Sequence, residues 1–512
     1  MLFNSPEFLL LFLPVVLAGY YALRHHRFEM AAVRFLVVCS LFFYGWWEPL
    51  YVPLIVGSIL FNYLIGRVLT RHHAAGGGKV VLAFGVALNL GLLGVFKYAN
   101  LAIDSMAALT GSDMGAVDII LPLAISFFTF QQIAYLVDAY QGKVEEPSLA
   151  TYCLFVSFFP QLIAGPIVHH REMIPQFLKC HQTDVVWRNL AIGFTIATIG
   201  LFKKLVLADR AGYWADQSFG AVARGIDVSF IDAWVGVLGF SFEIYFDFSG
   251  YTDMAIGLAR MFGIILPLNF ASPYKATSII DFWRGWHMTL TRFLRDYLYF
   301  PLGGNRLGSA RRYLNLMIVM LLGGLWHGAN WTFVAWGGLH GVFLAVNHGW
   351  RAWRGDSGDS TAVGRWTGRL LTFTAVTVAW VFFRADNFPA SLTMLRGLGG
   401  LNGVVLPIHY ADILGGLMPW LSGLGVTFGA LPVYGGGWQL VILAGLLGFV
   451  WLLPNTQEIM GDFEPAFDAR PTRALIRWQP SLASGLMIAV LASYLTLSLL
   501  QGPSGEFIYF EF

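Results

Sequence analysis

The sequence has few charged residues and little cysteine. Asp, Glu, Lys and Arg make up 12% of its 512 residues, whereas a soluble globular chain has about 25%. The three cysteines, Cys39, Cys153 and Cys180, have no paired spacing, so neither a disulfide framework nor a zinc or other metal site is indicated. The net charge of +2 gives no reason to expect a nucleic-acid partner.

The sequence also shows no repeat at a fixed period and no matching halves. This absence argues against many secondary-transporter folds, because those folds are built from repeats. The first 23 residues have no basic start and no small-residue cleavage site. We therefore predict a retained membrane span there and not a signal peptide.

Apolar and aromatic residues are abundant instead. Apolar residues make up 57% of the chain, with 18 Trp and 20 Tyr, which suit the aromatic belts of membrane interfaces. We predict an all-α polytopic membrane protein of about 11–13 membrane helices plus re-entrant and interfacial helices. It would form one domain over residues 1–512, with N-terminal helices in 1–110, a core in 117–350 and C-terminal helices in 365–512. Apolar spans are predicted near residues 6–24, 30–47, 51–69, 79–96, 117–138, 187–208, 230–248, 313–326, 331–347, 370–384, 436–455 and 481–501.

Basic residues predict the orientation of these spans. Residues 284–312 hold six arginines, whereas residues 99–118 contain no Lys or Arg. The positive-inside rule then places 284–312 in the cytoplasm and both termini on the outer, periplasmic side. Lys203 and Lys204 fit this scheme poorly.

His327 lies in the apolar stretch LMIVMLLGGLWHGANWTFVAWGGLHGVFLAV, residues 316–346. A charged residue at this depth costs roughly 2.5–3.5 kcal/mol on insertion scales, and a neutral imidazole still needs a hydrogen-bond partner. We therefore expect His327 to face a protein interior or a wet cavity and to carry chemistry. The alternative is a core histidine that is bonded to a backbone carbonyl.

His287 lies 40 residues earlier, in SIIDFWRGWHMTLTRFLRDYLYFPLGG. In a continuous helix Trp283, His287, Leu290 and Leu294 share one stripe, which predicts an amphipathic, arginine-bearing helix at the cytoplasmic boundary. His287 would then assist His327, or it would be a packed residue of a snorkelling surface helix. His340, in GGLHG, is more easily explained as a structural residue.

Several other polar residues stand in apolar surroundings. Asp247 and Asp253 are expected to anchor Lys or Arg partners and backbone amides at a helix break near Gly250, although paired carboxylates also suit a metal site or a proton relay. Residues 150–166 are predicted to be kinked or re-entrant, because prolines and a glycine interrupt them. Three residues of the span before them are expected to hold helices together: Gln131, Gln132 and Asp138.

These segments together resemble the membrane-bound O-acyltransferase (MBOAT) family, in particular its bacterial alginate O-acetyltransferase branch. Their shared order and spacing make the resemblance specific. The segments that carry it are FYGWWEPLY (43–51), LPLAISFFTFQQIAYLVDAYQG (121–142), FFPQLIAGPIV (158–168), FDFSGYTDMAIGLARMFG (246–263), NFASPYKA (269–276), DFWRGWHMTLTRFLRDYLYFPLGGNR (281–306), LWHGANWTFVAWGGLHG (325–341), WVFFRADNF (380–388) and LPNTQEIM (453–460).

The resemblance implies an MBOAT-like helical bundle and site residues. The family's catalytic histidine maps onto His327 and its second polar residue onto His287. Gly285 stands where the family often has a second arginine. Supporting residues would be His340, Trp326 and Asn330, and the donor would be held by Arg284, Arg292 and Arg295.

The resemblance also implies a reaction. An acetyl group would pass from a cytosolic thioester, with acetyl-CoA as co-substrate and no tightly bound cofactor, to a hydroxyl beyond the membrane. His327 would act as general base or transient acyl carrier. In this branch periplasmic acetyltransferase partners pass the group on to an exopolysaccharide such as alginate, and the location is the bacterial inner membrane. D-alanyl transfer to teichoic acid, by a related branch, and a proton-coupled transporter remain alternatives.

Overall fold

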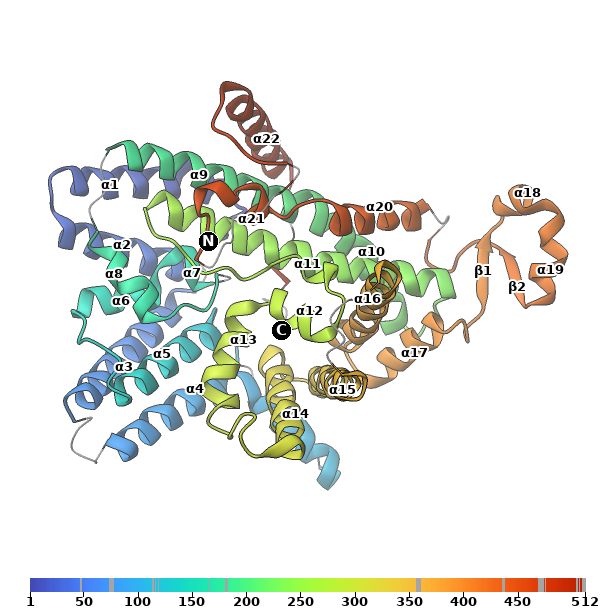
Figure 1. Cartoon of the computed structure of the whole chain (residues 1–512), viewed down its shortest axis with the longest axis horizontal. Helices are drawn as coiled ribbons and strands as arrows, with labels where there is room; N and C mark the ends of the chain where they lie inside the picture. The colour runs from blue at the N-terminus through green and yellow to red at the C-terminus, as the bar shows by residue number, and fades with distance from the viewer. Residues whose placement is uncertain are drawn as a thin grey trace.

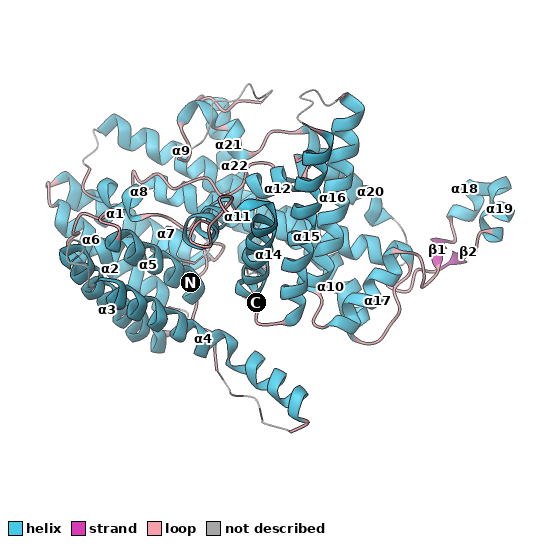
Figure 2. Ribbon diagram, turned by 60° about the horizontal axis from the view of Figure 1, so that its bottom comes forward, coloured by secondary structure: helices cyan, strands magenta, loops and turns pink. Residues whose placement is uncertain are grey.

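Helices form nearly all the regular structure of the chain, as the ribbon in Figure 2 shows. The computed structural model describes residues 1–512 except positions 47, 73–77, 113–114, 116, 118, 164, 180–182, 356–360, 435–437, 468–473, 475, 503–504, 506 and 509–512. The prediction of an all-α protein is confirmed. Cys39 and Cys153 are free thiols, and Cys180 lies outside the described residues.

Each of the twelve predicted spans overlaps a helix (Figure 1), although the helix in the span predicted at 117–138 begins only at Ile125. Their apolar residues fix these segments as helices, because only a helix satisfies its own backbone groups in an apolar medium. The helices are α1 (Leu13–His25), α2 (Glu29–Gly45), α3 (Val52–His72), α4 (Gly78–Thr110), α5 (Ile125–Tyr140), α9 (Thr183–Phe202), α11 (Phe230–Met261), α14 (Gly308–His327), α15 (Trp331–Arg354), α16 (Ala362–Arg384), α20 (Trp438–Leu452) and α22 (Leu482–Gln501).

Shorter elements connect these helices. The segment 150–166 is broken as predicted, into α6 (Leu149–Ser157) and α7 (Phe159–Leu162). A parallel pair of strands, β1 (Val404–Pro407) and β2 (Val426–Gly429), lies at one end of the molecule with two of the short helices (Figure 1). The remaining α-helices of the described residues are α8 (His170–Phe177), α10 (Asp209–Ala223), α12 (Ile279–Gly285), α13 (Met288–Leu294), α17 (Phe388–Leu398), α18 (Tyr410–Leu414), α19 (Met418–Gly423) and α21 (Thr456–Ile459). The π-helical turns are Phe8–Phe12, Lys203–Ala208 and Arg295–Tyr299. The 3-10 turns are Pro49–Tyr51, Pro273–Lys275, Gly415–Leu417 and Gly461–Phe463.

Six helical segments among the described residues are long and apolar enough to cross a membrane. They are Phe8–His25, Pro49–Arg71, Gly78–Thr110, Val185–Ala223, Ala362–Arg384 and Leu482–Gln501. The protein is therefore a multi-pass membrane protein. The other predicted spans are helices that are shorter, less apolar or more charged, so the total number of crossings stays a prediction.

Helix α11 lies at the centre of the bundle and packs along α9 (Figure 1). Two glycine pairs permit this close approach. A Cβ at Gly193 would lie 2.4 Å from the carbonyl oxygen of Gly257, and a Cβ at Gly200 would lie 2.6 Å from that of Gly250. Small residues of this kind let membrane helices approach until their backbones touch.

The predicted helix break near Gly250 is wrong, because α11 runs unbroken past it. The expectation of lysine partners is confirmed. Lys203 lies 2.6 Å from the carboxylate of Asp253, and Lys204 lies 2.7 Å from that of Asp247. Buried charges are tolerated when they are paired. The two lysines therefore balance carboxylates inside the bundle, which explains why they do not follow the positive-inside pattern.

Two segments that are far apart in the sequence meet on α11. The Tyr251 hydroxyl donates to Asn4 Oδ1 at 2.6 Å, and Asn4 Nδ2 donates to the carbonyl oxygen of Gly505 at 3.3 Å. The ring of Phe507, which is fully buried, lies 4.3 Å from that of Tyr251. Residues near both ends of the numbering are therefore part of the core.

The predicted orientation can be tested with reporter fusions. Gln141 and Pro301, from two segments predicted to be cytoplasmic, line one cavity, as segments on the same side of a membrane can. We expect fusions after Gln141 and after Arg312 to report the cytoplasm and a fusion after Gly111 to report the outer side. A cytoplasmic signal at Gly111 would overturn the orientation.

Candidate active site

His327 is the last residue of α14, at the point where α14 and α15 turn back on each other. The two helices touch through glycines, since a Cβ at Gly324 would lie 2.2 Å from the carbonyl oxygen of Phe333. Gly328 continues in an extended conformation and ends α14. Asn330 then begins α15 by accepting a hydrogen bond from the amide of Thr332 at 3.0 Å, which is a typical helix N-cap. The predicted supporting residue Asn330 thus shapes this turn.

His287 lies in a break between α12 and α13, so the predicted continuous helix is wrong. Its backbone is left-handed, with φ of +42°, which is uncommon for a residue other than glycine. The break is held by Asn269, whose carbonyl oxygen accepts from the amide of Met288 at 2.9 Å and whose side chain accepts from Thr289 Oγ1 at 2.9 Å. These hydrogen bonds to Asn269 replace the helical ones, and the periodicity of apolar residues in the sequence does not predict them.

The structure brings the two predicted catalytic histidines together. The ring centroids of His287 and His327 are 6.3 Å apart, and the two side chains are buried, at 0% and 3% exposed. Trp326 packs against both, at 6.1 Å from His287 and 5.0 Å from His327. The predicted supporting role of Trp326 therefore has a geometric basis.

Hydrogen bonding indicates the tautomer of His287. Its Nδ1 lies 3.2 Å from Asn269 Oδ1, an oxygen that can only accept. Nδ1 must then carry the proton in the neutral ring, which leaves the lone pair on Nε2; this assignment rests on the bonding network. Nε2 is buried and has no hydrogen-bond partner among the described residues. His287 is thus preset to accept a proton at Nε2.

His340 lies one aromatic layer away from the pair. The ring of Trp336 separates it from His327, at 5.2 Å from His327 and 4.7 Å from His340. His340 Nδ1 accepts a hydrogen bond from the indole of Trp283 at 3.2 Å. This arrangement fits the structural interpretation of His340 better than a direct catalytic role.

A narrow cleft of about 50 Å³ reaches His327 from the segment that precedes α5. Lys97, from the middle of α4, lines this cleft and was missed by the sequence reasoning, which placed the end of a span just before it. A lysine in the interior of a 33-residue apolar helix was the available signal. The other lining residues are Leu121, Pro122, Ala124, Ile125, Ser126, Phe127 and Trp326.

A second, charged cavity of about 670 Å³ lies between the end of α5, α8 and the turn after α13. Tyr297 lines it, and its hydroxyl donates to Asp138 Oδ2 at 3.1 Å. Burial, and next the nearby charge of Arg292, lower the pKa of His169 in the same wall, so its imidazole is neutral near pH 7. The cavity presents two basic side chains, Lys143 and Arg171.

Stacked aromatic rings connect this charged cavity to the histidines. Tyr297 lies 5.1 Å from Phe293, which stacks on Phe130 at 4.3 Å. Phe130 in turn stacks on Trp326 at 5.3 Å. Trp326, Ile167 and Leu290 form a small apolar cluster that is separate from the main core. A series of packed rings thus spans the distance between the charged cavity and the histidine pair.

The three arginines predicted to hold the donor have different surroundings. Arg292 forms a half-buried pair with Glu172, at 2.9 Å between Nη2 and Oε2, and so is held by the fold. Arg295 is exposed and pairs with Asp296, which lines the charged cavity. Arg284 is exposed and pairs with Asp281, away from that cavity. Neighbouring Gly285 has no room for the arginine of the family, because its Cβ would lie 2.8 Å from the carbonyl oxygen of Ala271.

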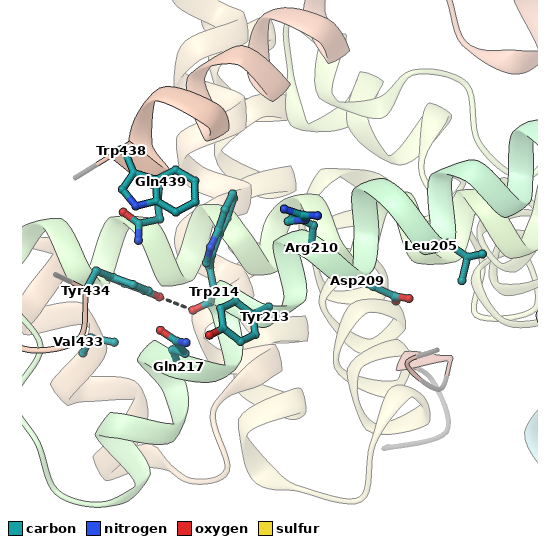
Figure 3. A pocket seen from close by; sticks show the side chains of 10 residues that line it. All are labelled: Leu205, Asp209, Arg210, Tyr213, Trp214, Gln217, Val433, Tyr434, Trp438 and Gln439. Carbon is teal, nitrogen blue, oxygen red and sulfur yellow. Dashed lines mark hydrogen bonds between the residues drawn. The ribbon is translucent and has the colours of Figure 1, made fainter. Parts of the chain in front are cut away.

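A further cavity of about 560 Å³ lies along α10, away from the histidines (Figure 3). The Tyr434 hydroxyl points towards the backbone of Trp214 there and donates to its carbonyl oxygen. None of the predicted site residues lines it. Among the described residues, no group of three or more His, Cys, Asp and Glu side chains could hold a metal ion.

A multi-pass helical bundle with a buried histidine pair, one member of which lines a cleft, has the arrangement expected of a membrane-embedded acyltransferase. Residues 139–386 match the family model "MBOAT, membrane-bound O-acyltransferase family". The chain belongs to that family and is an O-acyltransferase, which sets the transporter alternative aside.

Relatives support the same family. A peptidoglycan O-acetyltransferase of Helicobacter pylori is 45% identical over 433 residues, which cover 79% of this chain and 81% of the relative. A probable alginate O-acetylase AlgI of Azotobacter vinelandii is 41% identical and covers 78% of each chain. A teichoic acid D-alanyltransferase of Streptococcus thermophilus is 26% identical and covers 51% of this chain and 68% of the relative.

Proposed function

We propose that the protein transfers an acetyl group from acetyl-CoA in the cytosol to a polysaccharide hydroxyl on the outer side of the bacterial inner membrane. The observation that carries this proposal is the buried pair of His287 and His327, with ring centroids 6.3 Å apart, at the inner end of a cleft. Imidazole is the side chain whose reference pKa suits proton transfer near neutral pH. The pair therefore suits the removal of a proton from an attacking hydroxyl.

The transfer needs one proton to move. As the acceptor oxygen attacks the thioester carbonyl carbon, its proton goes to an imidazole nitrogen. The C–S bond then breaks, and the leaving thiolate takes that proton. We assign the proton transfer to His327, which lines the cleft. In the alternative mechanism, His327 carries the acyl group transiently. His287 orients His327 or relays its proton through Nε2.

The donor is proposed to approach from the charged cavity. The phosphates of coenzyme A suit arginine and lysine side chains, and Arg171 and Lys143 line this cavity, whose wall also holds Asp296, the partner of Arg295. The thioester end of the molecule would then follow the stacked rings of Tyr297, Phe293 and Phe130 towards the histidines. No tightly bound cofactor is needed for this chemistry.

The acceptor side suggests a relay. The cleft at His327 measures about 50 Å³, whereas pockets that hold small molecules measure about 300–1,000 Å³. A polysaccharide segment does not fit such a cleft. We therefore propose that a periplasmic acetyltransferase partner takes the acetyl group at the mouth of the cleft and passes it to the polymer.

Two acceptors have specific support. Relatives named for alginate O-acetylation are 38–41% identical to this chain, and a relative named for peptidoglycan O-acetylation is 45% identical. D-alanyl transfer has weaker support, because its relatives are 25–26% identical over about half of the chain. The test is transfer of radiolabelled acetyl from acetyl-CoA by purified protein in proteoliposomes. A small alcohol serves as the direct acceptor, and alginate or peptidoglycan glycan strands are added together with a periplasmic extract that supplies the partner. Failure of all acceptors with acetyl-CoA would overturn the proposal.

The donor cavity gives a prediction for two arginines. We expect Arg171→Ala and Arg295→Ala to raise the KM for acetyl-CoA about 5–10-fold and to change kcat less, because they remove a phosphate contact made equally in ground and transition state. With S-acetylpantetheine, which lacks the nucleotide phosphates, the same variants should behave like the wild type. Arg284→Ala is the matched control and should leave both constants unchanged. An unchanged KM in Arg171→Ala and Arg295→Ala would exclude these contacts.

A further inference from the structure

Lys97 reaches the end of α14 from the middle of α4. Its Nζ donates to the carbonyl oxygens of Trp326 at 2.7 Å and of His327 at 3.0 Å. The next residue, Tyr98, donates through its hydroxyl to the carbonyl oxygen of Leu325 at 3.0 Å. The last carbonyls of a helix have no partners within the helix, so α4 supplies donors for three successive carbonyls at the reactive end of α14.

Helix capping alone does not require a charge here. Tyr98 shows that a neutral hydroxyl is sufficient to donate to one of the three carbonyls. A lysine well inside an apolar helix is energetically costly, so a functional role is the default explanation for it. Lys97 also lines the cleft of about 50 Å³ together with His327. A molecule that reaches the imidazole of His327 through this cleft therefore also passes the ammonium group of Lys97.

Lys97 has a donor left for a ligand in the cleft. An ammonium group has three N–H donors, and two of them are used by the carbonyls of Trp326 and His327. The third has no acceptor among the described residues. Preorganised donors of this kind stabilise a developing oxyanion in acyl transfer.

We propose that Lys97 is a catalytic residue whose third N–H binds the acyl carbonyl oxygen in the cleft and stabilises the oxyanion that forms during attack. The acceptor oxygen adds to the carbonyl carbon and gives its proton to the imidazole. The electron pair of the C=O bond moves to the oxygen beside Lys97, then returns to expel the thiolate, which takes the proton from the imidazolium. This role rests on the proposed acetyl transfer and adds the group that holds the negative charge.

The structure offers matched variants for a test. Lys97→Met removes the charge and all donors at similar length. Lys97→Gln keeps two N–H donors for the carbonyls, on a side chain one bond shorter, but lacks the charge. Tyr98→Phe removes the neighbouring capping bond without changing charge, and Lys97→Arg keeps the charge. Each is purified, its thermal midpoint is measured, and kcat and KM for acetyl-CoA are determined in proteoliposomes with a small alcohol as acceptor.

We expect Lys97→Met and Lys97→Gln to lower kcat about 10²–10³-fold, the usual effect of losing one oxyanion donor, with the KM for acetyl-CoA within threefold. Tyr98→Phe should lose less than fivefold in kcat, and Lys97→Arg should recover activity above Lys97→Gln. A Lys97→Gln enzyme with the kcat of Tyr98→Phe would overturn the proposal and leave Lys97 as a cap. If Lys97→Met does not accumulate in the membrane, the comparison of Lys97→Gln with Lys97→Arg decides whether the charge of Lys97 is needed.

Failure of this proposal is separable from failure of the proposed function. An active Lys97→Gln protein would remove only the role of Lys97. An active His327→Ala protein, or a wild type that transfers no acetyl group, would remove the reaction itself.

Discussion

Replacement of His327 by alanine is expected to reduce acetyl transfer to background, a loss of at least about 10³-fold, within the range of general acid–base catalysis. His327 lines the cleft and lies at the end of α14, where Trp326, Trp336 and Phe383 surround its ring. No other imidazole lines this cleft among the described residues. The measurement is the initial rate of labelled acetyl transfer, normalised to the amount of protein in the membrane.

The protein should still insert, because one ring is small beside the many packed helices. A purified His327→Ala protein with a normal thermal midpoint and a rate close to that of the wild type would refute the assignment. Incubation of the wild type with labelled acetyl-CoA and no acceptor separates the two roles of His327. Label retained on the residue supports an acyl carrier, whereas its absence supports a general base.

Replacement of His287 by alanine is expected to lower kcat about 10²-fold and to leave some activity, since the other imidazole remains. His287 is fully buried and presents Nε2 towards the site, because its Nδ1 is bonded to Asn269 at 3.2 Å. The KM for acetyl-CoA should change little, because the charged cavity is separated from His287 by stacked rings. Kinetics in proteoliposomes measure both constants.

His340→Ala is the matched control for this variant. His340 is also fully buried among aromatic rings but is bonded to Trp283 and lies behind Trp336. It should lose less than about tenfold, through packing and not through proton transfer. Equal losses for His287→Ala and His340→Ala at equal stability would mean that His287 serves only packing.

The sequence was sufficient to place the helices and the proline-marked break within 150–166, but not the features that depend on contacts between distant segments. Apolar runs predicted a helix at twelve places, and the structure has a helix at each, because burial in lipid or protein demands continuous apolar length. The break at His287 depends on Asn269, and the close approach of α9 to α11 depends on the pair Gly200 and Gly250. Both are contacts between distant segments, which leave no periodic trace in the local sequence.

The candidate site could be predicted only in part, because the contacts that complete it also come from distant segments. The resemblance pointed to His287 and His327, and the structure places them together. The resemblance could not assign Asn330 to a helix cap or Arg292 to a pair with Glu172, since the partners of a polar side chain come from other elements. Lys97 was overlooked because a lysine next to an apolar run looks like the end of a span.

The contact between Asn4 and Gly505 joins positions 501 apart, and it has a consequence for biosynthesis. Phe507 packs on Phe248 at 5.8 Å, and Phe248 packs on the ring of His287 at 4.7 Å. The wall behind this histidine is therefore incomplete until residue 507 has left the ribosome, since contacts of such separation form last. A chain that stops before residue 505 carries both histidines but lacks the packing that holds one of them, so partial translation products should be inactive.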